Sequence, residues 1–461
     1  MLDKQKVTDF KAALRGGVVE PSDKGYDQVR ALYNGMIDKK PRLIARCTSA
    51  ADVIAAVNFG RDNDIVIAIR GGGHNGPGLA SVDGGIMIDL SLMKGVHVDP
   101  ATSMVRVEPG CTQGDVDHAA AAFGLAVPAG IVSSTGIAGL TLGGGTGYLT
   151  RQYGLTIDNL ISADVVLADG SFVTASEKQN ADLFWALRGG GGNFGVVTSF
   201  LFKAHPVKNV YGGPIFWDIK DAAKVMSVYR DFIGKAPEKL GVFLGLKTVP
   251  PSAPFPEAIW NRRICAIIGA YDGTQAEGEA AMKPLLDKVP APIMNGMGVV
   301  PFTGLQTAFD PIFPKGLQWY WKGDYVKELT DEAIETHVKH ASQSPSWMCL
   351  THLYPVDGAA HRVGAGDTPW GARDAKWSMV IAAIDPSPAK ANDLKKWGRA
   401  YWEAVHPFNM GGAYVNFLDA DENDGRVQAS YGANYKRLSE VKKKYDPRNL
   451  FRVNQNIRPA A

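Results

Sequence analysis

The sequence contains few cysteines, and none lies close to another. Only four occur in 461 residues, at Cys47, Cys111, Cys265 and Cys349. Because there is no CxxC pair, the sequence predicts neither a zinc site of the usual spacing nor a disulfide framework. We therefore expect reduced thiols, as in a cytoplasmic protein, and no metal centre.

Long apolar runs and an excess of one charge are also missing. No apolar run reaches the roughly 18 residues of a membrane helix, and residues 1–17 lack the apolar core of a signal peptide. The net charge is only +2, which gives no general attraction to nucleic acid or acidic lipid. These absences favour a cytoplasmic globular protein with neither nucleic acid nor membrane as partner, and they leave its oligomeric state open.

Glycine is abundant, with 52 residues, many of them clustered. Clustered glycines usually mark a close backbone approach or unusual backbone dihedrals. The length is too great for one simple core and predicts two large units.

The hydrophobic pattern changes near residue 208. Before it, short apolar runs and helical patterns alternate, and we expect strands at 65–69, 86–90, 96–98, 104–107, 164–167 and 171–174 and helices at 51–61, 115–123 and 182–188. After it, longer strands are expected at 210–217, 242–248, 264–271 and 377–384, with amphipathic helices at 221–233 and 274–286. The pattern predicts an α+β protein whose second unit packs on the first.

The first glycine cluster follows an apolar run and contains a histidine. It comprises Arg70, Gly71, Gly72, Gly73, His74, Asn75, Gly76 and Gly78. Successive backbone N–H groups in such a segment can converge on a phosphate. A neutral histidine next to them is a potential nucleophile. A glycine-rich turn with a structural histidine explains this motif equally well when it is taken alone.

Two further clusters follow. The second runs from Ser133 to Gly147 and provides hydroxyl groups and a wall with few side chains, suited to a large flat ligand with phosphates. It has neither the GxGxxG spacing of a nicotinamide-binding crossover nor the Gly-Lys-Ser/Thr of a Walker loop. The third, residues 182–198, predicts a short helix that ends in four glycines before a strand, more glycine than a helix cap requires.

Three such clusters in one α/β unit resemble a known family. Residues 38–207 resemble the FAD-binding domain of the vanillyl-alcohol oxidase superfamily, the para-cresol methylhydroxylase type, and residues 431–457 resemble the tail of berberine-bridge-enzyme-like oxidases. The resemblance implies an α+β flavoprotein with two domains. Residues 1–207 and the returning tail, 406–461, would form the FAD-binding domain, and residues 208–405 would form a substrate-binding domain with an antiparallel sheet.

The resemblance also implies which residues bind FAD. His74 would join the 8α-methyl carbon of the flavin, the first cluster would wrap the pyrophosphate, and the tail would lie near the flavin. Besides the first cluster, the implied FAD-binding residues are Ser133, Ser134, Thr135, Gly136, Gly139, Gly143, Gly144, Gly192, Val197, Asn454 and Asn456.

Two positions refine this expectation. Many family members carry a second flavin bond from a cysteine four residues before Gly136, where this chain has Val132. We therefore expect attachment through His74 alone. Thr135 occupies the position that lines the oxygen site in relatives, and its small size favours an oxidase that uses molecular oxygen.

The catalytic base is less clearly indicated. The family often has a Tyr-x-Asn-Tyr motif, and this chain has Tyr414, Asn416 and Phe417 in that pattern. The position that carries a glutamate in alkaloid-type members falls near Arg362, which makes an alkaloid-cyclising mechanism doubtful. Tyr414, with Asn416, is the preferred candidate, and its pKa near 10 would have to be lowered by a neighbour such as Lys322 or Arg362. The alternatives to Tyr414 as the base are His352, Tyr354 and His361.

The implied function is FAD-dependent oxidation of a C–OH or C–N bond in a small organic substrate, with oxygen as acceptor. A flavin dehydrogenase with another acceptor and a flavin-binding protein without catalysis remain alternatives.

Three other patterns have both a functional and a structural interpretation. His337 and His340 could bind a metal, but a solvated helix face is favoured. The aromatic run Trp319, Tyr320 and Trp321, with Phe313 before it, suits either a substrate pocket or a core. The basic run 442–444 is interpreted as a solvated helix face rather than a nucleic-acid patch.

Overall fold

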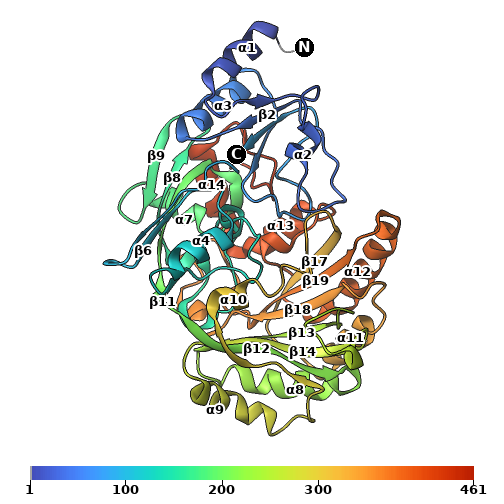
Figure 1. Cartoon of the computed structure of the whole chain (residues 1–461). Helices are drawn as coiled ribbons and strands as arrows, with labels where there is room; N and C mark the ends of the chain where they lie inside the picture. Colours follow the sequence, from blue (N-terminus) through green and yellow to red (C-terminus); the bar gives the residue numbers. More distant parts are fainter. Residues whose placement is uncertain (1–2) are drawn as a thin grey trace.

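The computed structural model describes residues 3–461, which form two regions (Figure 1). The upper region in the figure contains the N-terminal part of the chain and its C-terminal end. The lower region is a large sheet with helices on its outer side. No helix of residues 3–461 is long and apolar enough to cross a membrane.

The first sheet of the upper region leads into the first glycine cluster. Its strand order is β1-β2-β4-β3, with β2 and β3 parallel to the central β4. The strands are β1 (Val18–Val19), β2 (Leu43–Arg46), β3 (Ile67–Arg70) and β4 (Ile86–Asp89), and helix α3 (Ala50–Asp62) packs against them. At the end of β3, Arg70 is paired with Asp89 of β4, with Nη2 to Oδ2 at 2.6 Å. This pair holds the strand end from which the cluster begins.

The second sheet of the upper region is antiparallel, in the order β5-β6-β10-β8-β9. Its strands are β5 (Val96–Asp99), β6 (Met104–Val107), β8 (Leu160–Val166), β9 (Phe172–Ser176) and β10 (Val196–Lys203). Residues of three helices share a hydrophobic core with it: α4 (Gln113–Ala121), α5 (Ile137–Gly143) and α7 (Ala181–Leu187). A two-stranded ribbon pairs β7 (Leu125–Ala126) with β11 (His205–Pro206).

The lower region is an eight-stranded antiparallel sheet in the order β15-β12-β14-β13-β18-β19-β17, with β16 also paired to β12. Its strands are β12 (Asn209–Asp218), β13 (Leu240–Thr248), β14 (Arg263–Tyr271), β15 (Met294–Asn295), β16 (Gly298–Pro301), β17 (Gln318–Val326), β18 (Leu350–Pro355) and β19 (Trp377–Asp385). The outer helices are α8 (Ala222–Ile233), α9 (Gln275–Leu286), α11 (Asp331–Ala341) and α12 (Ala391–Val405).

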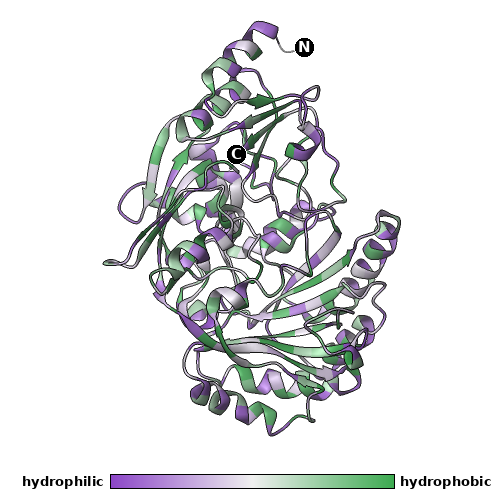
Figure 2. Cartoon of the chain, in the orientation of Figure 1, coloured by the Kyte–Doolittle hydropathy of each residue, from purple (hydrophilic) through white to green (hydrophobic). Residues whose placement is uncertain are grey.

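The two faces of this sheet are different. One face shares a core with the outer helices, and α8 and α9 show both hydrophobic and hydrophilic surfaces in Figure 2, as amphipathic helices do. The other face carries a second core that includes residues of the upper region, among them Tyr33 and Tyr148. A pocket that uses this second face is therefore bounded by both regions.

The C-terminal segment returns to the upper region, where it is red among the blue and green elements of Figure 1. It contains α13 (Asp424–Tyr431) and α14 (Tyr435–Tyr445), and α14 packs on α7. The remaining helices are short, namely α1 (Lys4–Ala13), α2 (Tyr26–Arg30), α6 (Thr150–Tyr153) and α10 (Phe302–Gln306), with 3₁₀ turns at 156–159, 191–193, 219–221, 257–259, 358–362, 388–390, 406–408, 415–417 and 432–434.

Most predicted strands and helices are confirmed within about three residues at each end, and two predictions about surface faces are wrong. His337 is buried, and its Nδ1 lies 2.9 Å from the Tyr401 hydroxyl, so it does not belong to a solvated helix face. Lys442 is fully buried and ion-paired with Asp446, so only the later part of the basic run is exposed. The four cysteines are all buried and free of disulfides.

Candidate active site

One large cavity lies where the glycine clusters approach the inner face of the eight-stranded sheet. Its volume is about 340 Å³. All three glycine clusters contribute to its lining, as do the C-terminal tail and strands β17, β18 and β19. From the predicted site, the lining includes Gly71, Gly72, Gly73, His74, Asn75, Thr135, Gly136, Gly139, Gly192, Val197, Tyr414, Asn416 and Asn454.

The first and second clusters touch each other through their glycine backbones. A Cβ atom on Gly72 would lie 2.4 Å from the Cα of Gly136, and one on Gly143 would lie 2.5 Å from the side-chain amide of Asn416. Gly73 has φ +71° and Gly78 has φ +69°, values that side chains disfavour. The sequence therefore requires glycine here for close approach and for backbone conformation.

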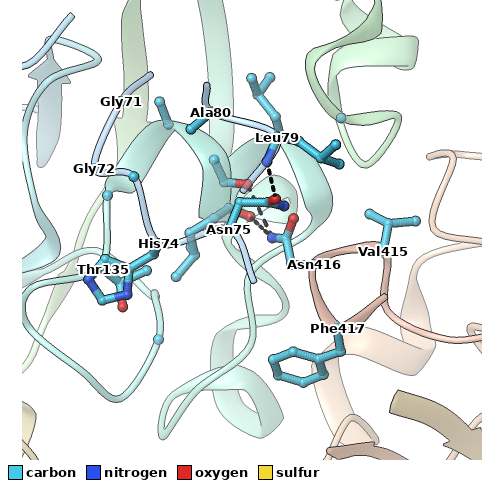
Figure 3. A pocket seen from close by; sticks show the side chains of 18 of the residues that line it. Gly71, Gly72, His74, Asn75, Leu79, Ala80, Thr135, Val415, Asn416 and Phe417 are labelled. Atoms are coloured by element: carbon cyan, nitrogen blue, oxygen red, sulfur yellow. Dashed lines mark hydrogen bonds between the residues drawn. The ribbon is translucent and has the colours of Figure 1, made fainter. Parts of the chain in front are cut away.

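His74 lies at the edge of this cavity. Its ring stacks on Tyr33 with centroids 3.8 Å apart, and its Nε2 lies 3.1 Å from the Ser134 hydroxyl. Figure 3 shows the His74 ring beside Thr135, so both side chains face the same part of the cavity. Burial lowers the pKa of His74 to about 3, which keeps the imidazole neutral at physiological pH.

The other predicted residues do not line the cavity. Gly76 packs against Trp321, Gly144 against Trp370, and Ser133 bonds through its N–H to Asp310 at 3.1 Å. The positions not among the lining residues are Arg70, Gly76, Gly78, Ser133, Ser134, Gly143, Gly144 and Asn456.

Tyr414 and Asn416 are brought together below the second cluster. The Tyr414 hydroxyl accepts hydrogen bonds from the Gly145 N–H at 3.0 Å and from the Asn416 amide at 2.7 Å. It donates to the Leu140 carbonyl at 3.3 Å. Burial raises the pKa of Tyr414 to about 12. The side chain is thus a protonated tyrosine whose hydroxyl is fully occupied by the protein.

The aromatic run divides between two faces of β17, as alternation along a strand requires. Trp319 and Trp321 line the cavity, whereas Tyr320 belongs to a separate small core. On β18, Leu350, His352 and Tyr354 line the same cavity. The aromatic run thus contributes Trp319 and Trp321 to a cavity wall and Tyr320 to a core, and its role as a substrate pocket stays a prediction.

Three candidates for proton transfer or for lowering the Tyr414 pKa lie outside the lining of the cavity. His361 bonds through Nε2 to the Ala375 carbonyl at 2.7 Å. Lys322 is paired with Asp421 and Glu422, and Arg362 with Glu238.

The sequence reasoning missed Tyr33 and Phe309, both of which line the cavity. Tyr33 precedes the segment in which the FAD-binding core was expected. Its hydroxyl donates to the Phe313 carbonyl at 2.7 Å, a contact across 280 residues of chain that no local pattern signals.

The residues present fit FAD. The glycine backbones leave a cavity wall without side chains, and a neutral histidine stands at its edge. Buried oxygen atoms without a partner among the described residues include Oδ1 of Asn454, Oδ1 of Asn456 and the hydroxyl of Tyr431. Such atoms are costly unless a ligand or water bonds to them, and a ribityl chain or an isoalloxazine ring carries suitable groups.

Comparison with known proteins agrees with this fit. A family model described as "FAD binding domain" matches residues 41–176, and one described as "Berberine and berberine like" matches residues 413–458. The chain is 33% identical over 462 residues to an FAD-linked oxidoreductase of Dictyostelium discoideum, covering 99% of this chain and 97% of the relative. It is 30% identical to (R)-6-hydroxynicotine oxidase of Paenarthrobacter nicotinovorans, with 97% of each covered.

Solved structures show the same fold. The 6-hydroxy-D-nicotine oxidase from Arthrobacter nicotinovorans superposes with a TM-score of 0.86 at 27% identity, covering 97% of this chain and 98% of that chain. A chitooligosaccharide oxidase superposes with a TM-score of 0.85 at 25% identity, covering 99% and 100%. The fold is thus that of vanillyl-alcohol-oxidase-type flavoproteins. The chain belongs to the berberine-bridge-enzyme-like family of FAD-linked oxidoreductases.

Proposed function

We propose that this chain is an FAD-dependent oxidase of a small organic substrate, with FAD attached through His74 alone and molecular oxygen as the electron acceptor. The observation that supports it best is that three glycine clusters, a neutral histidine and the aromatic side chains of a sheet face all line the same cavity. Residues 1–207 and 406–461 would bind the cofactor, and residues 208–405 would bind the substrate.

The residues that would hold FAD are those of the predicted site. The first cluster would hold the pyrophosphate, the segment from Ser133 to Gly144 would complete the pocket, and Gly192 to Val197 would lie by the adenine. Asn454 would bond to the flavin or its ribityl chain through its free Oδ1, and Asn456, which does not line the cavity, would lie nearby. When bound, FAD accepts a hydride from the substrate carbon.

Attachment at a single residue is supported by the surroundings of the nearest cysteine. The Cys111 carbonyl accepts a hydrogen bond from the Ile137 N–H at 3.0 Å, so this residue lies beside the second cluster. Its thiol, however, points to the Gly95 carbonyl at 3.6 Å and does not line the cavity. Burial raises the pKa of the thiol to about 12. A second covalent bond from a cysteine is therefore not expected.

Replacing His74 by alanine should release the flavin. Acid-precipitated wild-type protein is expected to stay yellow, whereas the His74→Ala protein should leave its flavin in the supernatant, as measured by absorbance near 450 nm. Ser134→Ala is the matched control, since it removes only the neighbour of Nε2 and leaves the nucleophile. A colourless wild-type precipitate would show that the link does not exist.

Thr135 supports oxygen as the acceptor, because its small side chain lines the cavity beside His74. The test is stopped-flow reoxidation of the substrate-reduced enzyme in air-saturated buffer. Rapid reoxidation with one peroxide formed per turnover supports the oxidase. Slow reoxidation with rapid transfer to a quinone indicates the dehydrogenase, and a flavin that no substrate reduces indicates a binding protein.

The predicted role of Tyr414 as base has a clear pH signature. Because its pKa is about 12, only about one molecule in 10⁵ is deprotonated at pH 7. If Tyr414 removes the substrate proton, the rate of flavin reduction should rise about tenfold per pH unit through the alkaline range. Tyr414→Phe should abolish this rise. A flat profile that Tyr414→Phe leaves unchanged would assign Tyr414 to holding the second cluster in place.

A further inference from the structure

The cavity wall formed by the large sheet carries few polar groups, and the imidazole of His352 is one of them. His352 lies on β18, opposite Gly245 of β13 and Val380 of β19. A Cβ at Gly245 would come within 3.3 Å of the His352 ring, so glycine makes room for the ring on this face. The ring packs against Phe243, with centroids 4.8 Å apart, and is 2% exposed.

The hydrogen bonds of His352 determine which nitrogen carries the proton. Its Nδ1 lies 2.7 Å from the Tyr354 hydroxyl, and this nitrogen is the acceptor available to that O–H. We assign the Tyr354 O–H as the donor to Nδ1, which places the hydrogen of the neutral ring on Nε2. The Nε2 atom is buried and has no partner among residues 3–461. A buried N–H without an acceptor is costly, and a ligand oxygen would satisfy it.

A second donor lies on the same sheet face. Lys247 is opposite Leu350, a cavity-lining residue, and its ammonium group lies 5.8 Å from the ring centroid of Phe313, another lining residue. No carboxylate of residues 3–461 lies within ion-pair distance of Lys247, although the residue is only 8% exposed. Burial lowers the pKa of Lys247 to about 8, and its charge adds to the effect of burial in lowering the pKa of His352 to about 3.

Within residues 3–461, the rest of the lining carries no acidic group and is rich in aromatic rings. Among the described residues, no aspartate or glutamate lines the cavity, so an ammonium group would find no counter-ion there. The sheet side also includes Tyr354 and the aromatic residues Trp319, Trp321, Phe309 and Phe313, with aliphatic neighbours.

We propose that His352, assisted by Lys247, binds an anionic oxygen of a flat, apolar substrate, and that this contact sets the specificity of the enzyme. The proposal deepens the proposed function and rests on it. In this arrangement the aromatic side chains stack on the substrate body, and the Nε2–H donates to its oxygen. His352 is then a binding residue that donates a hydrogen bond, rather than a base that removes a proton.

Three probes of similar size test the charge preference on the enzyme as isolated with its flavin: benzoate, benzyl alcohol and benzylamine. Their dissociation constants can be measured from the quenching of tryptophan fluorescence, because Trp319 and Trp321 line the cavity. We expect benzoate to bind at least about tenfold more tightly than the other two, because a hydrogen bond to a charged oxygen contributes about that factor in affinity.

Three variants locate the contact. His352→Phe keeps a ring but removes the donor, and it should weaken benzoate binding about 10- to 100-fold with little change for benzyl alcohol. His352→Gln restores a donor and should recover part of the loss. Lys247→Met, which leaves the His352–Tyr354 bond intact, should weaken benzoate binding independently of any folding defect in the first variant.

Equal loss for all three probes, or tightest binding of benzylamine, would overturn the proposal. The flavin content of each protein is measured in parallel. A wild-type enzyme that retains FAD but has no preference for benzoate contradicts this inference alone. A wild-type protein without FAD contradicts the proposed function, while the fluorescence titration still tests the binding site.

Discussion

Replacing Lys442 by methionine is expected to lower the free energy of unfolding by about 3–5 kcal/mol, the usual cost of removing one partner of a buried ion pair. The Lys442 ammonium donates to Asp446 at 2.7 Å, to the Asn193 carbonyl at 2.6 Å and to the Phe451 carbonyl at 2.9 Å. Methionine fills a similar volume but leaves the carboxylate and both carbonyls without this donor. Burial already lowers the pKa of Lys442, and Asp446 opposes that effect.

Urea unfolding followed by circular dichroism measures the loss. Lys443→Met is the matched control, because it changes the neighbouring residue of the same helix at an exposed position. Its effect should stay within about 0.5 kcal/mol, as for most surface substitutions. Equal midpoints for the two variants would mean that the ion pair contributes nothing.

The same contacts connect the tail to the third glycine cluster. Asn193 donates through its amide to the Gln455 carbonyl at 3.1 Å, and its side-chain oxygen accepts from the Ile457 N–H at 2.9 Å. Lys442 bonds to the backbone of this same residue. Loosening the connection should therefore also reduce the retention of FAD in His74→Ala, the variant that lacks the proposed covalent link.

Lys442 also illustrates where sequence reasoning fails. Three consecutive lysines usually indicate a solvated helix face, and this holds for Lys443 and Lys444, which are exposed. The burial of Lys442 depends on Asp446 one helical turn later and on carbonyls 9 and 249 residues away. The predicted exposure of His337 was wrong for the same reason, because its partner Tyr401 lies 64 residues further along the chain.

Local patterns predicted the strands well because buried strands are continuous apolar runs. The runs at 210–217 and 264–271 became β12 and β14 with one additional residue at most at either end. Local patterns did not predict helix α5, since Ile137–Gly143 contains two glycines and therefore has a low helix propensity. Tertiary packing overrides that low propensity: Ile137, Leu140 and Leu142 of α5 are all buried in the core of the upper region.

The cofactor side of the candidate site was readable because its chemistry is local. A glycine cluster needs only consecutive residues, so the three clusters could be found in the sequence, whereas the roles of His74 and Gly136 follow from the family resemblance and stay predictions. The opposite side of the cavity is assembled from three strands of one sheet, β17, β18 and β19. His352 and Lys247 come together only because β13 and β18 are neighbours, which requires the pairing register and not the sequence pattern.

Gly72→Ala is expected to abolish flavin retention. The added Cβ would lie 2.4 Å from the Cα of Gly136 and 2.5 Å from its nitrogen, and these backbone atoms can move away only if one glycine cluster shifts. Overpacking of this kind costs typically about 1–3 kcal/mol. The shift would also displace the neighbouring His74 and Thr135 relative to each other.

The readouts are the flavin-to-protein absorbance ratio and the melting temperature. Gly234→Ala is the matched control, because a Cβ there meets nothing within 4 Å and its φ of −69° suits alanine. The control should keep its flavin, with a melting temperature equal to that of the wild type or higher. A Gly72→Ala protein with full flavin content would show that the two clusters can separate without loss, and that their contact does not define the cofactor site.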